Sequence, residues 1–268
     1  MSEAARPVLV LHADPEVGPR VRAAMRGGYT VQEAADWTDL RAALREAPPS
    51  TLVVLDPYFG SAPQLAPELL HLLTDFPSTP VVAAIRLDPE ATEDLFTLTD
   101  WGLTEIVTLT HDDTPNALRE RLRGAQGRPL KVLLDSLLPH DLPAQARTII
   151  DTAAEVVATG GSIHDLAARL GISERTLRRW CEAGGLPPAR KLLTWMRLLL
   201  AAELLDDPGR TAVGVAHTFG YSTGTNFWKA MHAFAGAGPT ALRERGAFAA
   251  ASRAFLARLA KYRRRAGS

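Results

Sequence analysis

The chain has 268 residues, 46% of them hydrophobic, and a formal net charge of zero. This length is enough for two globular domains, and this apolar content is enough for a hydrophobic core in each. A single cysteine excludes an intrachain disulfide framework and fits a reducing cytosol, and neither a membrane-spanning run nor a signal peptide is recognisable, so we expect a cytoplasmic protein without a membrane partner. The seven histidines are not paired with cysteine at metal-ligand spacing, and we expect no metal and no cofactor.

The neutral total hides a charge asymmetry between the two halves. Residues 1–129 carry 11 Lys and Arg against 19 Asp and Glu, a net charge of −8, whereas residues 130–268 carry 19 against 11, a net charge of +8. One interpretation of these two net charges is that the charged residues simply form an ordinary solvated surface. An acidic half joined to a basic half nevertheless favours one module that binds nucleic acid and one that does not.

The N-terminal half alternates short apolar runs with amphipathic segments. The runs predict strands at Val8–Leu11, Thr30–Ala34, Leu52–Leu55, Val81–Ile85 and Glu105–Leu109. The segments between and after them predict helices at Glu16–Met25, Trp37–Glu46, Leu65–Asp75, Ala91–Trp101 and Thr114–Arg123. Strands rich in Val, Leu and Ile that alternate with helices are typical of a parallel sheet covered on both faces, here a five-stranded, flavodoxin-like doubly wound α/β domain.

Within this pattern, VLVLHADPE and TLVVLDPYFG resemble the first and third strands of response-regulator receiver domains, and the resemblance extends over about residues 7–123. It places Asp56, at the end of the third strand, where a receiver has its phosphoacceptor aspartate. Asp56 is therefore a candidate phosphoacceptor. The alternative is a polar strand end that caps the following loop.

The remaining positions of the receiver pocket depart from the family pattern. Receivers have an acidic pair after the first strand to hold Mg²⁺, but the chain has His12 and Ala13 there, with Asp14 just beyond. Ile85 stands where the family has Ser or Thr, and Leu109 stands where it has Lys. Phosphoryl transfer to a carboxylate needs a cation and a group that holds the product, so we expect a degenerate receiver.

A degenerate receiver would serve as a dimerisation surface, a docking platform or a small-molecule sensor, and the sequence does not choose among these. A working response regulator phosphorylated on Asp56 is the alternative. An enzyme that uses the αβ domain for chemistry and the C-terminal half for DNA targeting is disfavoured, because no nucleophile and base stand together in the sequence. We therefore expect no catalytic residues.

The connection between the halves begins at Gly124–Pro129, whose composition is that of a turn. Leu130–Leu138 is apolar but too short to stand alone as a helix, and we expect it to pack on either domain or on a partner chain. Ala144–Thr159 predicts a helix that opens the C-terminal domain, with a short dimeric coiled coil as a disfavoured alternative. The predicted division is a regulatory domain at 1–124, a linker at 125–143 and a DNA-binding domain at 144–268.

Two helix-turn-helix units follow in tandem, at Ser162–Trp180 and at Thr211–Met231. Each has a small residue in its first helix (Ala167, Ala216), a glycine at the turn (Gly171, Gly220), and a serine where the second helix begins (Ser173, Ser222). The small residue lets two helices cross closely, the glycine tolerates positive φ, and the serine satisfies free N–H groups at the helix start. Such a unit places its second helix in the major groove of DNA.

From Ala144 to Arg245 the chain resembles the DNA-binding domain of AraC/XylS transcription regulators, in which two helix-turn-helix units flank one long helix. The matching residues are Leu166, Ala167, Ser173, Leu177, Arg179, Arg197, Ala201, Leu204, Leu205, Val213, Val215, Ala216, Gly220, Tyr221, Ser222, Phe227, Gly236, Pro239 and Arg243. The resemblance implies an all-α domain and a transcription regulator of bacterial type. It also implies double-stranded DNA as the partner, while a homodimer through the receiver-like domain and RNA polymerase remain open as further partners.

In the first recognition helix, predicted at Glu174–Glu182, helical spacing points Leu177 and Cys181 inward and the arginines outward. Arginine can donate a bidentate pair of hydrogen bonds to guanine or bind phosphate. By family position the DNA-binding residues are Arg175, Thr176, Arg178 and Arg179, and a solvated arginine face is the alternative.

The second recognition helix, predicted at Thr223–Met231, has Phe227 inward and fewer charges. Asparagine can read adenine, threonine can contact a thymine methyl group, and lysine can hold phosphate. The predicted DNA-binding residues are Thr223, Gly224, Thr225, Asn226, Trp228 and Lys229. For Trp228, core packing and a place in the groove are equally favoured. We expect the first helix to dominate base reading and the second to position the protein.

A long helix at Ala189–Asp206 should hold the two units rigidly on successive major-groove faces, about 34 Å apart, and we expect such a rigid pair to require some bending of the DNA. Beyond the family domain, Ala247–Arg265 predicts an extra amphipathic helix with a basic end. This helix could pack on the domain or add phosphate contacts, and a membrane-surface role is disfavoured.

Overall fold

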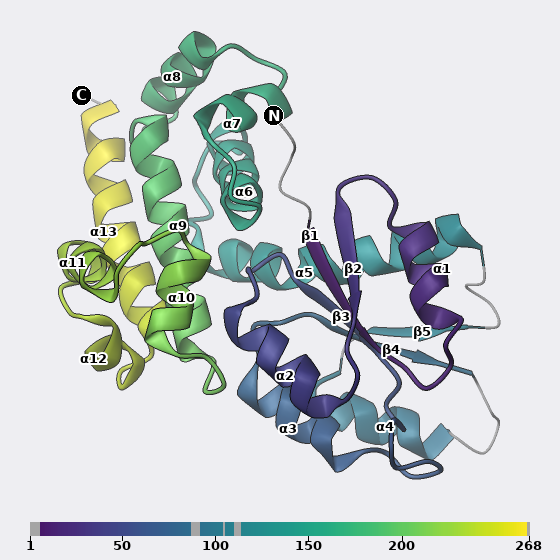
Figure 1. The fold of residues 1–268 in the computed structure, drawn as a ribbon. Helices are drawn as coiled ribbons and strands as arrows, with labels where there is room; N and C mark the ends of the chain where they lie inside the picture. The colour runs from purple at the N-terminus through teal and green to yellow at the C-terminus, as the bar shows by residue number, and fades with distance from the viewer. Residues whose placement is uncertain (1–5, 87–91, 104, 110–113, 267–268) are drawn as a thin grey trace. The chain divides into compact units, whose positions relative to one another are not determined.

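The computed structural model describes residues 6–86, 92–103, 105–109 and 114–266 (Figure 1). The chain divides into two compact units. The first consists of Met1–Pro129 together with the short segment Asp207–Arg210, and the second consists of Leu130–Asp206 and Thr211–Ser268.

The first unit is built on a five-stranded parallel sheet with the strand order β2-β1-β3-β4-β5. The strands are β1 Arg6–Leu11, β2 Tyr29–Glu33, β3 Leu52–Leu55, β4 Val81–Ile85 and β5 Glu105–Thr108. All five predicted strands are present, with small shifts at their ends. This order is that of the flavodoxin-like doubly wound fold, so the predicted fold class of this half is confirmed.

Helices cover both faces of the sheet because successive strand residues point to opposite sides (Figure 1). Leu9 and Leu11 belong to a core with α2, α3 and α4, whereas Val8 and Val10 belong to a second core with α1 and α5. The helices are α1 Val17–Ala24, α2 Trp37–Glu46, α3 Pro67–Asp75, α4 Thr92–Asp100 and α5 Pro115–Leu137. The predicted start of the fourth helix at Ala91 lies outside the described residues.

Strand register brings the ends of β1 and β3 together. Leu11 pairs with Leu55, and the backbone N–H of Asp56 donates to the carbonyl oxygen of Leu11 at 2.8 Å. The residues that follow these strands, His12 and Asp56, therefore lie at the carboxyl edge of the sheet, where ligand sites of this fold form.

The prediction of a turn at Gly124–Pro129 is wrong, because α5 runs as one helix through these residues. Early in the helix Leu118 and Leu122 are buried in the core of the first unit, and late in it Leu134 and Leu138 are buried in the core of the second. Apolar anchors on both sides of the stretch outweigh the weak helix propensity of glycine and proline. Leu130–Leu137 is thus the end of a long helix.

The second unit is entirely helical among its described residues. Its helices after α5 are α6 Ala144–Ala158, α7 Ile163–Arg169, α8 Glu174–Ala183, α9 Ala189–Asp206, α10 Ala212–Thr218, α11 Gly224–Ala235, α12 Pro239–Arg243 and α13 Ala247–Ala266. The predicted all-α class is confirmed, and the long helix spans the predicted residues. No helix among the described residues has the length and apolar character required to cross a membrane.

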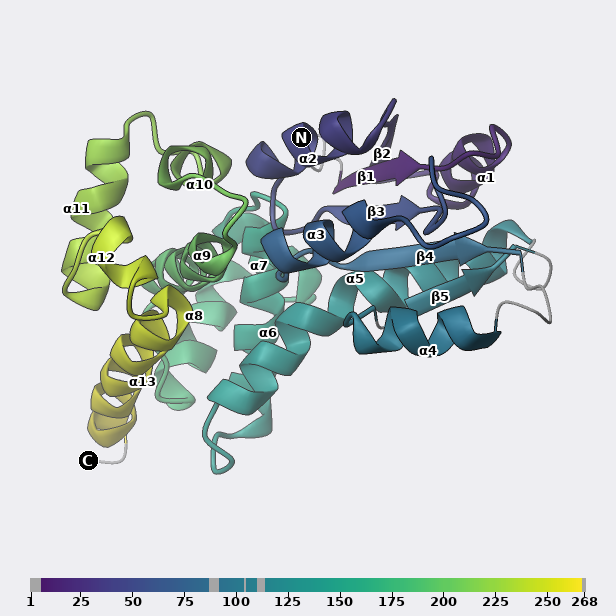
Figure 2. The same cartoon turned by 90° about the horizontal axis from the view of Figure 1, so that it is seen from below.

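Helix α9 is the centre of this unit. Most of its side chains are buried, and α6 and α13 pack along it (Figure 1; Figure 2). Trp195 contributes the largest of these side chains, and its ring lies 5.9 Å from the ring of Phe255 and 6.4 Å from that of Phe234. One core therefore joins the long helix to α11 and α13.

Candidate nucleic-acid interface

The first helix-turn-helix unit consists of α7 and α8. Ser162 and Asp165 form a capping box at the start of α7. Gly171 turns the chain at φ +67°, a value that L-residues with a side chain rarely adopt, and Ala167 is buried where the two helices meet. Ser173 then accepts a hydrogen bond from the backbone N–H of Thr176 at 3.1 Å and starts α8. The local roles predicted for these residues are all present.

Helix α8 separates its residues into two faces. Leu177 and Cys181 are buried, whereas Arg175, Arg178 and Arg179 are exposed. Among the described residues none of the three guanidinium groups has an ion-pair or hydrogen-bond partner within the protein. Three unpaired arginines on one exposed face give α8 a positive surface that an anionic ligand can contact without breaking internal bonds.

Thr176, predicted to contact DNA, lies at the start of the same helix and is half-buried. Its hydroxyl group is 3.0 Å from that of Ser173, and its N–H is the one that the serine caps. The hydroxyl group thus helps to fix the beginning of the helix. Cys181 lies on the opposite face, where burial raises the pKa of its thiol to about 11.

The second helix-turn-helix unit consists of α10 and α11. Thr211 caps α10 by accepting from the N–H of Gly214 at 3.0 Å, and Gly220 turns the chain at φ +75°. The cap of α11 is Thr223, whose Oγ1 accepts from the N–H of Asn226 at 3.3 Å. The prediction that Ser222 caps this helix is therefore wrong. Two adjacent hydroxyl residues are equal candidates in sequence, and only the backbone conformation, extended at Thr223, selects one.

All six DNA-binding residues predicted for α11 and its N-cap are exposed. Phe227 is buried and its ring lies 5.2 Å from that of Tyr221, which fixes the orientation of the helix. The exposed residues are Thr223, Gly224, Thr225, Asn226, Trp228 and Lys229. This face carries one cation against three on α8, as the sequence predicted.

Trp228 is not in the core, which was one of the two places predicted for it, and its place in the DNA groove stays a prediction. Its side chain is 49% exposed, so it is not a core residue. The indole stacks on the imidazole of His232 with ring centroids 4.8 Å apart, and a Cβ atom added at Gly238 would fall 2.0 Å from its Nε1. The ring therefore lies against Gly238 and its own helix, with one part of its surface open.

The C-terminal end of α9 is tied to α12 and to the start of α13 by polar contacts that the sequence did not reveal. Nε of Arg243 donates to the carbonyl oxygen of Leu205 at 2.6 Å, in the last turn of α9. The carboxylate of Asp206 accepts from the N–H groups of Ala247 and Phe248, at 2.6 and 2.9 Å, and so caps α13. These contacts give partners to one of the last carbonyl groups of α9 and to the first N–H groups of α13.

Helix α13 packs on the domain, which was one of the two roles predicted for it. Phe255 and Leu259 are buried, and the Arg258 guanidinium lies over the rings of Trp195 and Phe234. Arg258 also donates to the carbonyl oxygens of Ala233 and Phe234, near the end of α11. The helix thus completes the core around α9 and α11.

Asp56 lies in the first compact unit, which contains the sheet, and its carboxylate is hydrogen-bonded to the loop that follows β3. Oδ1 of Asp56 accepts a hydrogen bond from the N–H of Tyr58 at 2.9 Å, which is the loop-capping arrangement expected of a polar strand end. Asp14, the nearest acidic residue after β1, forms an ion pair with Arg86 at 2.7 Å. The pKa of Asp14 is lowered, first by the hydrogen bond from the N–H of Glu16 and then by Arg86.

His12 directly follows β1. Its Nδ1 accepts from the N–H of Asp14 at 2.9 Å, and its Nε2 lies 3.1 Å from the carbonyl oxygen of Ala84. These two contacts fit one neutral tautomer, with the proton on Nε2 donated to Ala84. Among the described residues no group of three or more His, Cys, Asp or Glu side chains is placed to hold a metal ion.

Comparison with known protein families gives a match for one segment of the chain. Residues 166–245 match a family model described as a helix-turn-helix domain. Among solved structures the chain is similar to full-length FixJ from B. japonicum, with 16% sequence identity and a TM-score of 0.41, over 81% of this chain and 98% of that chain. None of the curated proteins matches the chain. The family match includes both recognition helices and the long helix between them.

Proposed function

We propose that the chain is a sequence-specific regulator of transcription that binds double-stranded DNA through α8 and α11. The observation that carries the proposal is the pair of complete helix-turn-helix units, inside the segment that matches a helix-turn-helix family. Each unit presents an exposed polar face on its second helix, and both lie in the half of the chain with a net charge of +8. The resemblance to AraC/XylS regulators points to the same function.

The two recognition helices have different tasks in this proposal. Unpaired Arg175, Arg178 and Arg179 make α8 the main reader of bases, because arginine recognises guanine with two hydrogen bonds. Helix α11, with Lys229 as its cation, mainly positions the protein on the phosphate backbone. The two helices enter successive major-groove faces about 34 Å apart, and bending the DNA to fit a rigid pair costs on the order of a few kcal/mol.

We further propose that the first unit is a pseudo-receiver that regulates the second or pairs two copies of the chain. Asp56 caps its own loop, Asp14 is paired with Arg86, and Ile85 and Leu109 stand where phosphotransfer chemistry needs a hydroxyl group and a lysine. These residues fit a domain that carries a signal without taking a phosphoryl group. The functional boundaries at residues 124 and 143 belong to the same proposal, as does a location in the cytoplasm with the chromosome.

A selection experiment tests the regulator proposal. The full chain is incubated with a pool of random duplexes, and the bound fraction is amplified and sequenced over several rounds. We expect enrichment of a motif with two conserved blocks about one helical turn apart. A pool that stays random while the protein remains folded would contradict sequence-specific binding.

A further inference from the structure

The four residues Asp207–Arg210 follow α9 and lead to α10, yet by their contacts they belong to the first compact unit, which otherwise consists of Met1–Pro129. The chain therefore passes between the two units three times, at Pro129–Leu130, at Asp206–Asp207 and at Arg210–Thr211. The segment between α9 and α10 is thus a part of the N-terminal unit inserted into the DNA-binding half.

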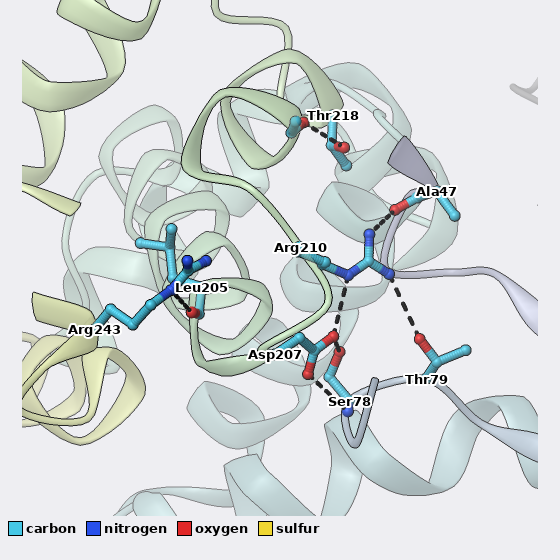
Figure 3. A network of polar contacts seen from close by, with 9 residues as sticks. Ala47, Ser78, Thr79, Leu205, Asp207, Arg210, Thr218 and Arg243 are labelled. Atoms are coloured by element: carbon cyan, nitrogen blue, oxygen red, sulfur yellow. Dashed lines mark hydrogen bonds and ion pairs between the residues drawn. The ribbon is translucent and has the colours of Figure 1, made fainter. Parts of the chain in front are cut away.

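The guanidinium group of Arg210 is the centre of the contacts that hold this segment (Figure 3). Its side chain is almost fully buried. Nη1 donates to the carbonyl oxygen of Ala47 at 2.7 Å, Nη2 lies 3.5 Å from the hydroxyl oxygen of Thr79, and the group lies over the ring of Phe76. Moving this buried arginine away from its three hydrogen-bond partners would cost free energy, because each lost partner leaves a charged N–H donor buried without a hydrogen bond.

Asp207 completes the ion pair. Its carboxylate accepts from Nε of Arg210 at 3.1 Å, from the N–H of Ser78 at 3.0 Å and from the hydroxyl group of Ser78 at 2.5 Å (Figure 3). Burial raises the pKa of Asp207, and the bonds from Ser78 and the charge of Arg210 act in the opposite direction. Both oxygens of the carboxylate are therefore engaged.

Shape complementarity adds to the polar contacts at Gly209. The N–H of Gly209 donates to the carbonyl oxygen of Asp75 at 2.9 Å, and the ring of Phe76 lies so close that an added Cβ atom would be 2.5 Å from its Cζ. Only a glycine fits against this ring. The first unit thus recognises an Asp-Pro-Gly-Arg segment by charge, hydrogen bonding and shape together.

The residues on either side of the segment each cap a helix of the second unit. Asp206 caps α13, and Thr211 caps α10, the first helix of the second helix-turn-helix unit. Neither cap is separated from the held segment by a flexible linker. A change in how the first unit holds residues 207–210 must therefore act directly on the beginning of α10 and α13.

We propose that the site formed by Ala47, Phe76, Ser78 and Thr79 is the control point through which the N-terminal unit acts on the second recognition helix. While Asp207–Arg210 is held, the start of α10 is fixed relative to the end of α9. When the segment is released, α10 and α11 gain freedom that DNA binding must remove, and affinity falls. The effect on DNA rests on the proposed function, whereas the effect on α10 does not.

Two variants of the full chain test the proposal in the absence of DNA. Ser78→Ala removes one hydroxyl donor to Asp207, and Gly209→Ala forces the segment away from Phe76. Hydrogen exchange of the α10 amides should become roughly 5- to 20-fold faster in both, because a buried polar group loses a partner or a close contact is broken. Exchange of the β4 amides should not change, which verifies that the sheet remains folded.

Matched substitutions provide the controls. Ser136→Ala removes a hydroxyl group that bonds only within its own helix, and Gly124→Ala adds a Cβ atom that meets nothing within 4 Å. Both should leave the exchange of α10 unchanged. Unchanged exchange in Ser78→Ala and Gly209→Ala as well would overturn the proposal.

DNA binding distinguishes this proposal from the function on which it rests. On a duplex selected by the unmodified chain, both test variants should bind several-fold more weakly than their controls. Faster exchange with unchanged affinity would mean that the segment does not control the second recognition helix. If the unmodified chain binds no duplex at all, the proposed function fails, while the exchange measurements still decide whether the segment restrains α10.

Discussion

The carboxylate of Asp14 forms an ion pair with the guanidinium group of Arg86, with 2.7 Å between Oδ2 and Nη2. The carboxylate of Asp14, three residues after β1, is thus neutralised by a cation of the protein, where Mg²⁺ binding would require free negative charge. We therefore expect that Asp56 does not accept a phosphoryl group. Incubation with Mg²⁺ and acetyl phosphate, followed by intact mass measurement, should show only the unmodified chain. A phosphorylated species that is lost in Asp56→Ala would contradict this prediction and restore the response-regulator alternative.

Arg179 on α8 should contribute directly to specific DNA binding. Replacement by alanine should cost about 1–3 kcal/mol on the selected duplex and relax base preference at one position of the motif. Fluorescence anisotropy with the selected duplex and with single-base variants measures both effects. Arg26→Ala, which removes an exposed arginine of the acidic half, is the control for the change in charge. Equal affinity of the two variants would remove Arg179 from the interface.

Lys229 on α11 should act through phosphate instead. Lys229→Ala should weaken binding to selected and random duplexes by the same factor, because a phosphate contact carries no base information. The slope of log affinity against log salt concentration should become shallower by about one unit. Binding measured between low and physiological salt gives the slope. A loss confined to the selected duplex would assign Lys229 to base reading.

Phe255 on α13 tests whether the C-terminal helix is part of the domain. The side chain is fully buried and its ring packs edge-on against that of Trp195. Phe255→Ala should lower the free energy of unfolding by about 3–5 kcal/mol, as a large buried cavity does. Urea unfolding followed by circular dichroism measures the change, with exposed Arg253→Ala on the same helix as the control. Similar midpoints for the two variants would show that α13 is dispensable.

Cys181 should be unreactive in the folded protein. Burial raises the pKa of its thiol to about 11, so the nucleophilic thiolate is scarce at pH 8 and the sulfur is shielded. Alkylation with iodoacetamide, followed by mass, should be slow in buffer and fast in urea. The rate in buffer should begin to rise only as the pH approaches the raised pKa. Rapid labelling of the native chain would show that α8 does not pack as described.

Much of the fold and of the candidate interface followed from local patterns. The alternation of apolar runs with amphipathic segments predicted the five strands and the class of the sheet, because buried parallel strands need helices on both faces. In the helix-turn-helix units, Gly171 and Gly220 could be identified because a positive φ requires glycine, and both adopt one. The inward positions of Leu177 and Phe227 followed from helical spacing.

Other features depended on partners distant in sequence. The turn predicted at Gly124–Pro129 is helix, because apolar residues before and after it are buried and hold the helix continuous. Ser222 and Thr223 offer the same hydroxyl group, and the path of the backbone decided which one caps α11. The packing of α13 required the aromatic ring of Trp195, about sixty residues earlier.

The sequence by itself determined the two recognition helices, because their glycine turns and their buried and exposed faces are set by residues within a few positions of one another. Only the tertiary structure decided the place of Asp207 and Arg210, which read in sequence as an ordinary charged turn beside Pro-Gly. Their partners Ala47, Ser78 and Thr79 lie more than 120 residues away in the sequence. Hydrogen bonds to these partners bury Asp207 and Arg210 and hold the segment in place. The burial of a charged residue by partners distant in the sequence leaves no periodic pattern in that sequence, and it is decided only by the fold of the whole chain.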